Sequence, residues 1–402
     1  MADLCNHFPG TEEMAAQIVA DWIESQLEML RRLARDRKRL MMISPAYQSH
    51  LRIASFSLDL SDLHDSGRSV LTIKFENGAC VIYKPRDSCG ERIWFGALRW
   101  MNENGFVVRF RIPRMLFREK YFLMALLRHK ECKNSKAVKR FYYCWGAQSA
   151  VSQILGMEDL HRGNWIATAT QPVLLDAEMV SYPSSRSSAV ARNWAGLNPL
   201  LRTGLLPIFD KEKVGLYSGI APLDSSFLAH ERLNCWPHLD GQTNLPSVFS
   251  SDVVRGYRAV MHFFADYDQR RKFSAQINKL SRHAEYRVLY RATGVYYAIL
   301  RSSYSPKRFL QRGSRMRHLR LACAGGSVAR QIETSEAQAL FRGCIPRFVG
   351  RSLKRNSAVP ILFFADSSRL LRARLTSKIA SLCQARLRSL RPVGYAWMSI
   401  IH

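Results

Sequence analysis

The chain has 402 residues, of which 47% are hydrophobic and 23% charged, and no compositional tract dominates it. This composition is typical of a globular protein whose core is divided into two or three subdomains, and it excludes a low-complexity chain. The longest apolar runs are far shorter than the ~20 residues that cross a bilayer, which excludes a transmembrane helix.

The net charge is +28, from 60 Lys and Arg against 32 Asp and Glu. Such a charge favours an acidic partner, which leaves open nucleic acid, an anionic membrane face, a nucleotide or an acidic peptide. Because no recognised nucleic-acid-binding module occurs, we expect no nucleic-acid partner. The nine cysteines are scattered without a CxxC pair, and the N-terminus lacks a secretory signal, so we expect reduced thiols and a cytoplasmic protein.

The first predicted element is an amphipathic helix over residues 11–40, with Arg and Lys crowded at its end, where the helix dipole favours cations. We expect this helix to pack on the rest of the protein through apolar residues at helical spacing: Met14, Ile18, Val19, Trp22, Leu27, Leu30 and Leu33.

The elements that follow alternate between strands and helices. Asn77-Gly78 is a strong turn signal between two strand-like runs, which predicts a hairpin over residues 70–83. Next we expect a helix over 90–104, strand-like pieces over 106–127 and a helix over 135–156. We then expect a loop over 157–165, short strands at 166–168 and 172–175, a loop over 181–193, and a mainly helical remainder. The order predicts an α+β fold with a C-terminal helical portion.

Four clusters in this order carry chemistry. Lys84 ends the second hairpin strand, where a Lys can hold nucleotide phosphates as a point charge, although an exposed Lys beside a turn is the simpler interpretation of this residue alone. Asp159 and Asn164 lie five residues apart, a spacing at which the Asp can accept a hydroxyl proton and the Asn can bind Mg²⁺, as in a kinase catalytic loop. A helix cap with a polar turn explains that loop equally well.

Asp176 and Glu178 follow a buried apolar strand, and a carboxylate there suits a second Mg²⁺ ligand. The chain order of Lys, helix, Asp/Asn loop and strand-end carboxylates is that of a kinase-like site. Farther on, Arg287 and Arg291 would point together at a phosphate if that segment were helical, whereas an Arg-rich solvated helix is the alternative.

These motifs resemble the dehydration domain of class II lanthipeptide synthetases, the LanM enzymes. The matching segments are Ser61–Val70, Tyr83–Arg86, Asp159 with His161 and Asn164, Asp176 with Glu178, Leu201–Pro207, Arg287 to Tyr296, and Glu336 with Ile345–Phe348. The resemblance implies a lipid-kinase-like core with a small β-rich lobe, a larger helical lobe and additional helices. It divides the chain into a helical segment (1–54), a dehydratase core (55–300) and a C-terminal helical portion (301–402).

The same resemblance implies ATP-dependent phosphorylation of Ser and Thr in a lanthipeptide precursor, followed by elimination of phosphate. It implies these roles: Lys84 binds the ATP phosphates; Asn164, Asp176 and Glu178 hold Mg²⁺; Asp159 deprotonates or orients the hydroxyl, supported by His161; Asp62 and His64 line the site; Arg287 and Thr293 act in elimination. The implied cofactors are ATP and Mg²⁺, with no zinc. The implied partners are a precursor with an acidic leader, a separate cyclase and an export transporter, in the bacterial cytoplasm or at the inner face of the membrane.

Four positions depart from the family pattern: Glu158, Ala292, Cys344 and Arg347. The chain also ends at His402 without the cysteine and histidine ligands of a cyclase, so we expect ring formation to be performed by another protein. Two other functions stay open: a peptide Ser/Thr kinase with poor elimination, and a non-catalytic remnant that binds an acidic peptide or nucleic acid.

Overall fold

The computed structural model describes residues 6–43, 52–57, 61–180, 198–206, 234–282, 285–288, 290–325, 329–351, 367–369 and 371–372. The loop expected over 181–193, Pro207 of the stretch 201–207, and the C-terminal residues 352–366, 370 and 373–402 lie outside the described residues. Every residue proposed for the site lies within them.

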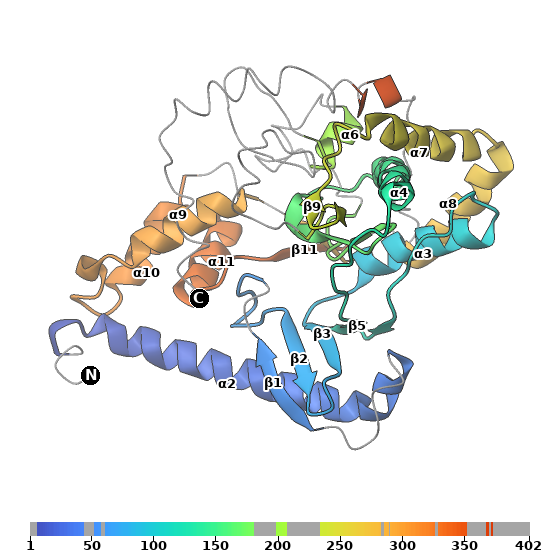
Figure 1. The fold of residues 1–402 in the computed structure, drawn as a ribbon. Helices are drawn as coiled ribbons and strands as arrows, with labels where there is room; N and C mark the ends of the chain where they lie inside the picture. The colour runs from blue at the N-terminus through green and yellow to red at the C-terminus, as the bar shows by residue number, and fades with distance from the viewer. Residues whose placement is uncertain are drawn as a thin grey trace.

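The fold is α+β and contains a five-stranded antiparallel sheet in the order β1-β2-β3-β5-β4 (Figure 1). Its strands are β1 (Ile53–Ser57), β2 (Leu71–Phe75), β3 (Cys80–Lys84), β4 (Met115–Phe117) and β5 (Phe122–Ala125). The predicted hairpin is confirmed: Gly78 adopts a φ of +81°, and the Asn77 side chain accepts a hydrogen bond from the Ala79 N–H. Between 106 and 127, only β4 and β5 are strands.

The central core lies between long helices and a small sheet. The helices are α3 (Cys89–Glu103), α4 (Ser135–Ile154), α7 (Ser250–Phe263) and α8 (Tyr267–Ser281), with a short α6 (Pro199–Arg202). Strands β6 (Trp165–Ala167) and β7 (Pro172–Leu174) pair, as do β8 (His238–Leu239) and β9 (Gln242–Thr243). Trp94, Trp145 and Trp165 are fully buried here, which anchors both α3 and α4 in one core.

Helices α4 and α7 cross at glycines. A Cβ at Gly146 would lie 1.9 Å from the Val253 carbonyl oxygen, and one at Gly256 would lie 1.9 Å from the Tyr143 carbonyl oxygen. No side chain fits in that space, so the two glycines allow the backbones to touch.

The C-terminal unit contains α9 (Thr293–Ser303), α10 (Ser314–Cys323) and α11 (Arg330–Phe341) around its own apolar cluster. Helix α9 spans the boundary expected at residue 300. The remainder is less helical than expected, because β10 (Glu285–Val288) pairs with β11 (Phe348–Arg351). Single turns of 3₁₀-helix occupy Arg162–Asn164 and Pro306–Arg308, and a longer one occupies Arg37–Met42.

Helix α2 (Gly10–Asp36) lies against both the sheet and the C-terminal unit (Figure 1). It is fixed mainly by polar contacts: Asp36 accepts hydrogen bonds from Arg118 and Tyr121 near the sheet, and Asp21 pairs with Arg342 at 3.2 Å beside α11. The expectation that its apolar residues pack inward is largely wrong. Leu33 is buried, but most of the predicted apolar face is exposed: Ile18, Val19, Trp22, Leu27 and Leu30.

Among the described residues, no helix is long and apolar enough to cross a membrane. The cysteines in the described part of the chain are free thiols, and all but Cys80 are buried.

The close contact between α4 and α7 predicts that an added methyl group destabilises the protein at Gly146 but not at Gly294. Gly146→Ala forces a methyl group into the Val253 carbonyl, so we expect a loss of about 1–3 kcal/mol in the free energy of unfolding. Gly294→Ala is the control, because it is also helical but nothing lies within 4 Å of the place that its methyl group would take; it should change stability by less than about 1 kcal/mol. Urea unfolding measures both, and equal stability of the two variants would contradict this packing.

Candidate functional site

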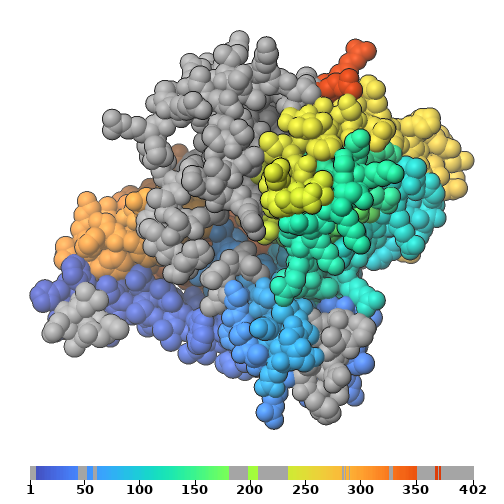
Figure 2. Space-filling view, viewed as in Figure 1, coloured from blue at the N-terminus to red at the C-terminus, as the bar shows by residue number. Residues whose placement is uncertain are grey.

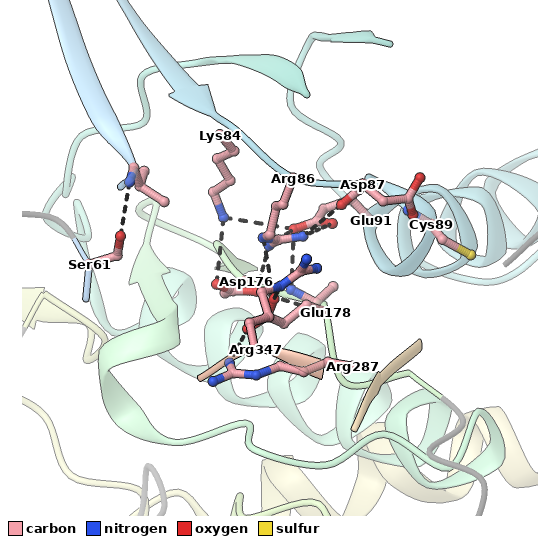
Figure 3. A network of polar contacts seen from close by, with 12 residues as sticks. Ser61, Lys84, Arg86, Asp87, Cys89, Glu91, Asp176, Glu178, Arg287 and Arg347 are labelled. Atoms are coloured by element: carbon pink, nitrogen blue, oxygen red, sulfur yellow. Dashed lines mark hydrogen bonds and ion pairs between the residues drawn. The ribbon is translucent and has the colours of Figure 1, made fainter. Parts of the chain in front are cut away.

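A buried guanidinium is the centre of the polar network that follows the hairpin. Arg86 donates to both carboxylate oxygens of Glu91, at 2.5 and 2.9 Å, and to Asp176 Oδ1 at 2.7 Å (Figure 3). Its Nε also lies 3.5 Å from Glu178 Oε2. One side chain thus joins α3 to the segment after β7.

Lys84 lies at the end of β3 and points at the same carboxylates (Figure 3). Its Nζ donates to the Leu175 carbonyl at 2.5 Å and lies 3.7 Å from Glu91 and 3.8 Å from Asp176. The residue is only 4% exposed, so the interpretation as a surface Lys beside a turn is wrong. A Lys this buried is held in place by its ion pairs.

Helix α3 packs so closely on the segment after β7 that the carboxylate of Glu91 enters the network. A Cβ at Gly90 would lie 1.9 Å from the Ala177 carbonyl oxygen, so only glycine fits there. The next residue, Glu91, is fully buried. The close approach explains why its carboxylate reaches both Lys84 and Arg86.

Glu178 faces three guanidinium groups. Arg287 donates a hydrogen bond to Glu178 Oε1, and Arg86 and Arg347 approach Oε2 at 3.5 and 3.7 Å (Figure 3). Burial by itself disfavours the charged carboxylate, but the three arginines outweigh it and hold the pKa of Glu178 well below its ordinary value. Glu178 is therefore an ionised partner of the arginines.

The expected catalytic loop is held against the segment after β7. The Leu175 N–H donates to the Asn164 carbonyl at 2.7 Å, and Asn164 Nδ2 donates to the Asp159 carbonyl at 2.9 Å. No described residue donates to Asn164 Oδ1, which leaves this oxygen available as a ligand. The predicted proximity of Asn164 and Asp176 in space is thus supported by backbone pairing.

Asp159 has a backbone φ of +61°, a region that non-glycine residues rarely adopt. Although Asp159 is exposed to solvent, its pKa is raised above the ordinary value. Partial desolvation is the main cause, with the negative charges of Asp176 and Glu178 adding to it, while His161 and Arg287 act in the opposite direction. Strain and a raised pKa together are common at functional carboxylates.

The helical arrangement considered for Arg287 and Arg291 is not the one found. Arg287 belongs to strand β10, and Arg291 lies in the turn before α9. Arg287 reaches Glu178, whereas Arg291 pairs with the buried Glu336, which also accepts a hydrogen bond from Tyr296. Arg287 therefore belongs to the site, and Arg291 stabilises the C-terminal unit.

The remaining predicted residues make no described hydrogen bond or ion pair to this network. His64 Nδ1 is 2.8 Å from the Ile345 carbonyl, and His64 lies close enough to Glu178 that a positive charge on its ring would lower the pKa of that carboxylate. Asp62 accepts a hydrogen bond from Tyr297 of α9, the helix that Thr293 begins. His161 Nδ1 accepts from the Gly163 N–H. In the described contacts, neither Asp62 nor Thr293 touches the network.

Sequence reasoning missed three members of the network: Arg86, Glu91 and Arg347. Arg86 ends the segment Tyr83–Arg86 and could have been found there. Arg347 stood out only as a departure from the family pattern, yet it lies 3.7 Å from Glu178 and 3.8 Å from Asp65. The unusual Glu158 is neutralised by Arg202 at 2.6 Å, so it adds little net charge beside Asp159.

The donor set bears on which ions the site can hold. In the described part of the chain, no group of three or more His, Cys, Asp or Glu side chains could by itself hold a metal ion. Asn164 Oδ1 and the Asp176 carboxylate are oxygen ligands of the kind Mg²⁺ takes together with phosphate oxygens. On the other side, the buried Nε atoms of Arg287 and Arg347 have no hydrogen-bond acceptor, and a phosphate oxygen would supply one.

All residues of the network lie within the part of the chain that one family model matches. A family model described as Domain of unknown function (DUF4135) matches residues 8–234 and 222–351. A comparison with curated proteins finds no match. Because the two matches together cover most of the sequence, the chain belongs to the DUF4135 family, a domain family associated with lanthipeptide synthetase-like proteins.

Proposed function

We propose that this protein dehydrates Ser and Thr residues of a lanthipeptide precursor, by ATP-dependent phosphorylation and then elimination of phosphate. The observation that carries the proposal is the convergence of Lys84, Glu91 and Asp176 within ion-pair distance. In protein kinases a strand Lys pairs with a helix Glu while an Asp after a later strand binds Mg²⁺. The same three roles come here from β3, α3 and the segment after β7.

A kinase-like core of the lipid-kinase type accounts for this arrangement. We assign the five-stranded sheet to the small lobe and α4, α7 and α8 to the larger one, with α3 packed in the core of the larger lobe. Lys84 would bind the ATP phosphates, and Asn164 and Asp176 would hold Mg²⁺. The metal would neutralise phosphate charge when bound. Since three arginines already neutralise Glu178, we assign it to positioning those arginines instead of to the metal.

The first reaction transfers the γ-phosphoryl group of ATP to a peptide hydroxyl oxygen, and Asp159 accepts the hydroxyl proton. Its raised pKa makes it a better base than an ordinary carboxylate. His161 lies close enough to influence the charge of Asp159, which supports a role in orienting it.

The second reaction removes the Cα proton and expels phosphate from Cβ, which leaves a carbon–carbon double bond. Arg287 and Arg347 support this step, because both are largely buried cations whose Nε makes no hydrogen bond. Buried guanidinium groups stabilise the negative charge that develops on a departing phosphate. The basic surface of the protein suits a precursor with an acidic leader.

A peptide kinase with poor elimination is the second candidate. It is favoured by one observation: Thr293, which the resemblance assigns to elimination, makes no described contact with the network. The residues assigned to phosphorylation are therefore more completely gathered in the network than those assigned to elimination.

Lys84→Ala tests the nucleotide site. Loss of a buried cation that binds phosphate should weaken Mg²⁺-ATP binding at least about tenfold, as measured by isothermal titration calorimetry. Lys74→Ala is the matched control, since Lys74 is exposed on the neighbouring strand β2 and should leave binding unchanged. Unchanged ATP affinity in a folded Lys84→Ala variant would rule out this assignment.

Arg287→Ala separates the two reactions. With Mg²⁺-ATP and a Ser/Thr-rich peptide that carries an acidic leader, the parent protein should yield peptide lighter by one water per modified residue. The variant should accumulate peptide heavier by one phosphoryl group, because the departing phosphate loses its cation. Mass spectrometry distinguishes the products, and Arg282→Ala, at an exposed position, should behave like the parent. Complete dehydration by Arg287→Ala would contradict the elimination role, and a parent that only phosphorylates would favour the kinase.

A further inference from the structure

Helix α2 carries an exposed apolar stripe on the side away from its contacts with the protein. The residues that face the protein are mostly polar: Asp21, Ser25, Gln26, Met29, Leu33 and Asp36 are buried. In contrast, Ile23, Leu27 and Leu30 are 46, 44 and 42% exposed. A surface helix normally shows the opposite arrangement.

The exposed stripe follows a heptad repeat. Its residues alternate in steps of three and four after Ala16, and all of them are exposed: Ala16, Ala20, Ile23, Leu27, Leu30 and Ala34. Such spacing keeps one seam in line over about 27 Å of helix and is the pattern by which two helices pack side by side. The small alanines at both ends would allow close approach.

The charges of α2 identify the partner. Residues 10–30 contain five acidic and no basic side chains, whereas residues 31–39 contain six basic and one acidic. A second copy of α2 running in the opposite direction would place the basic end of each helix beside the acidic stretch of the other. Parallel pairing would place like charges together.

One exposed pair beside the stripe is specific to that antiparallel arrangement. Glu24 and Arg31 directly follow Ile23 and Leu30, so both lie on the same edge of the seam. A two-fold axis near Leu27 brings Glu24 of each copy next to Arg31 of the other copy. Such an interface is self-complementary, as a two-fold dimer requires.

We propose that the protein forms a homodimer through antiparallel pairing of the α2 helices along this stripe. Figure 2 shows part of α2 in dark blue at the lower left of the molecule. The proposal is independent of the proposed dehydratase function, because the stripe contains none of the site residues.

Sedimentation velocity of the full chain over a concentration series tests the proposal. The parent should sediment as a dimer, and Leu27→Glu should raise the dimer dissociation constant at least about tenfold. Since Leu27 is already exposed in one copy, this variant should remain folded, with an unchanged thermal transition of the monomer. Leu321→Glu, at a 76% exposed position on α10, should remain dimeric.

Charge reversal tests the direction of pairing. Glu24→Arg and Arg31→Glu should each weaken the dimer, and the double variant should restore it, because both interchain pairs are re-formed with opposite signs. A parent that is monomeric at all concentrations overturns the proposal, and so does a dimer that survives Leu27→Glu. A double variant as weak as the single ones overturns the antiparallel arrangement.

Discussion

The guanidinium of Arg86 is the interaction on which the rest of the site depends. It is taken out of water between three carboxylates that come from two distant parts of the chain, Glu91 on α3 and the pair Asp176 and Glu178. Removing one partner from such a buried network leaves a charge that water cannot solvate, at a cost of several kcal/mol. Arg86 therefore fixes α3 against the segment after β7, and Lys84 is positioned as a result.

The charges around Glu178 connect stability to chemistry. Three arginines share the carboxylate of Glu178, and two of them also pair with other carboxylates: Arg86 with Glu91 and Asp176, and Arg347 with Asp65. A phosphate near Arg287 and Arg347 would be stabilised by these buried guanidinium groups. Under the proposed function, Arg287 and Arg347 would contact the departing phosphate, while Asn164 and Asp176 would hold Mg²⁺.

Local sequence signals predicted the helices and strands and part of the site. The other site residues and the orientation of α2 depend on contacts between distant parts of the chain. The turn at Asn77-Gly78 and the apolar runs determined the hairpin and the main helices, and the order of motifs brought Lys84 and Asp176 together correctly. Arg347 could not be found in this way, since strand β11 reaches the site only by pairing with β10. The periodicity of α2 likewise indicated an amphipathic helix but not which face meets the protein, because polar anchors such as Asp36 decide its orientation.

The most direct test of the site is a crystal structure of the protein with Mg²⁺ and a non-hydrolysable ATP analogue. We predict that the phosphates lie within hydrogen-bond distance of Lys84 Nζ and that the metal contacts Asn164 Oδ1 and the Asp176 carboxylate. Nucleotide bound elsewhere, with Lys84 still donating to the Leu175 carbonyl, would contradict the account.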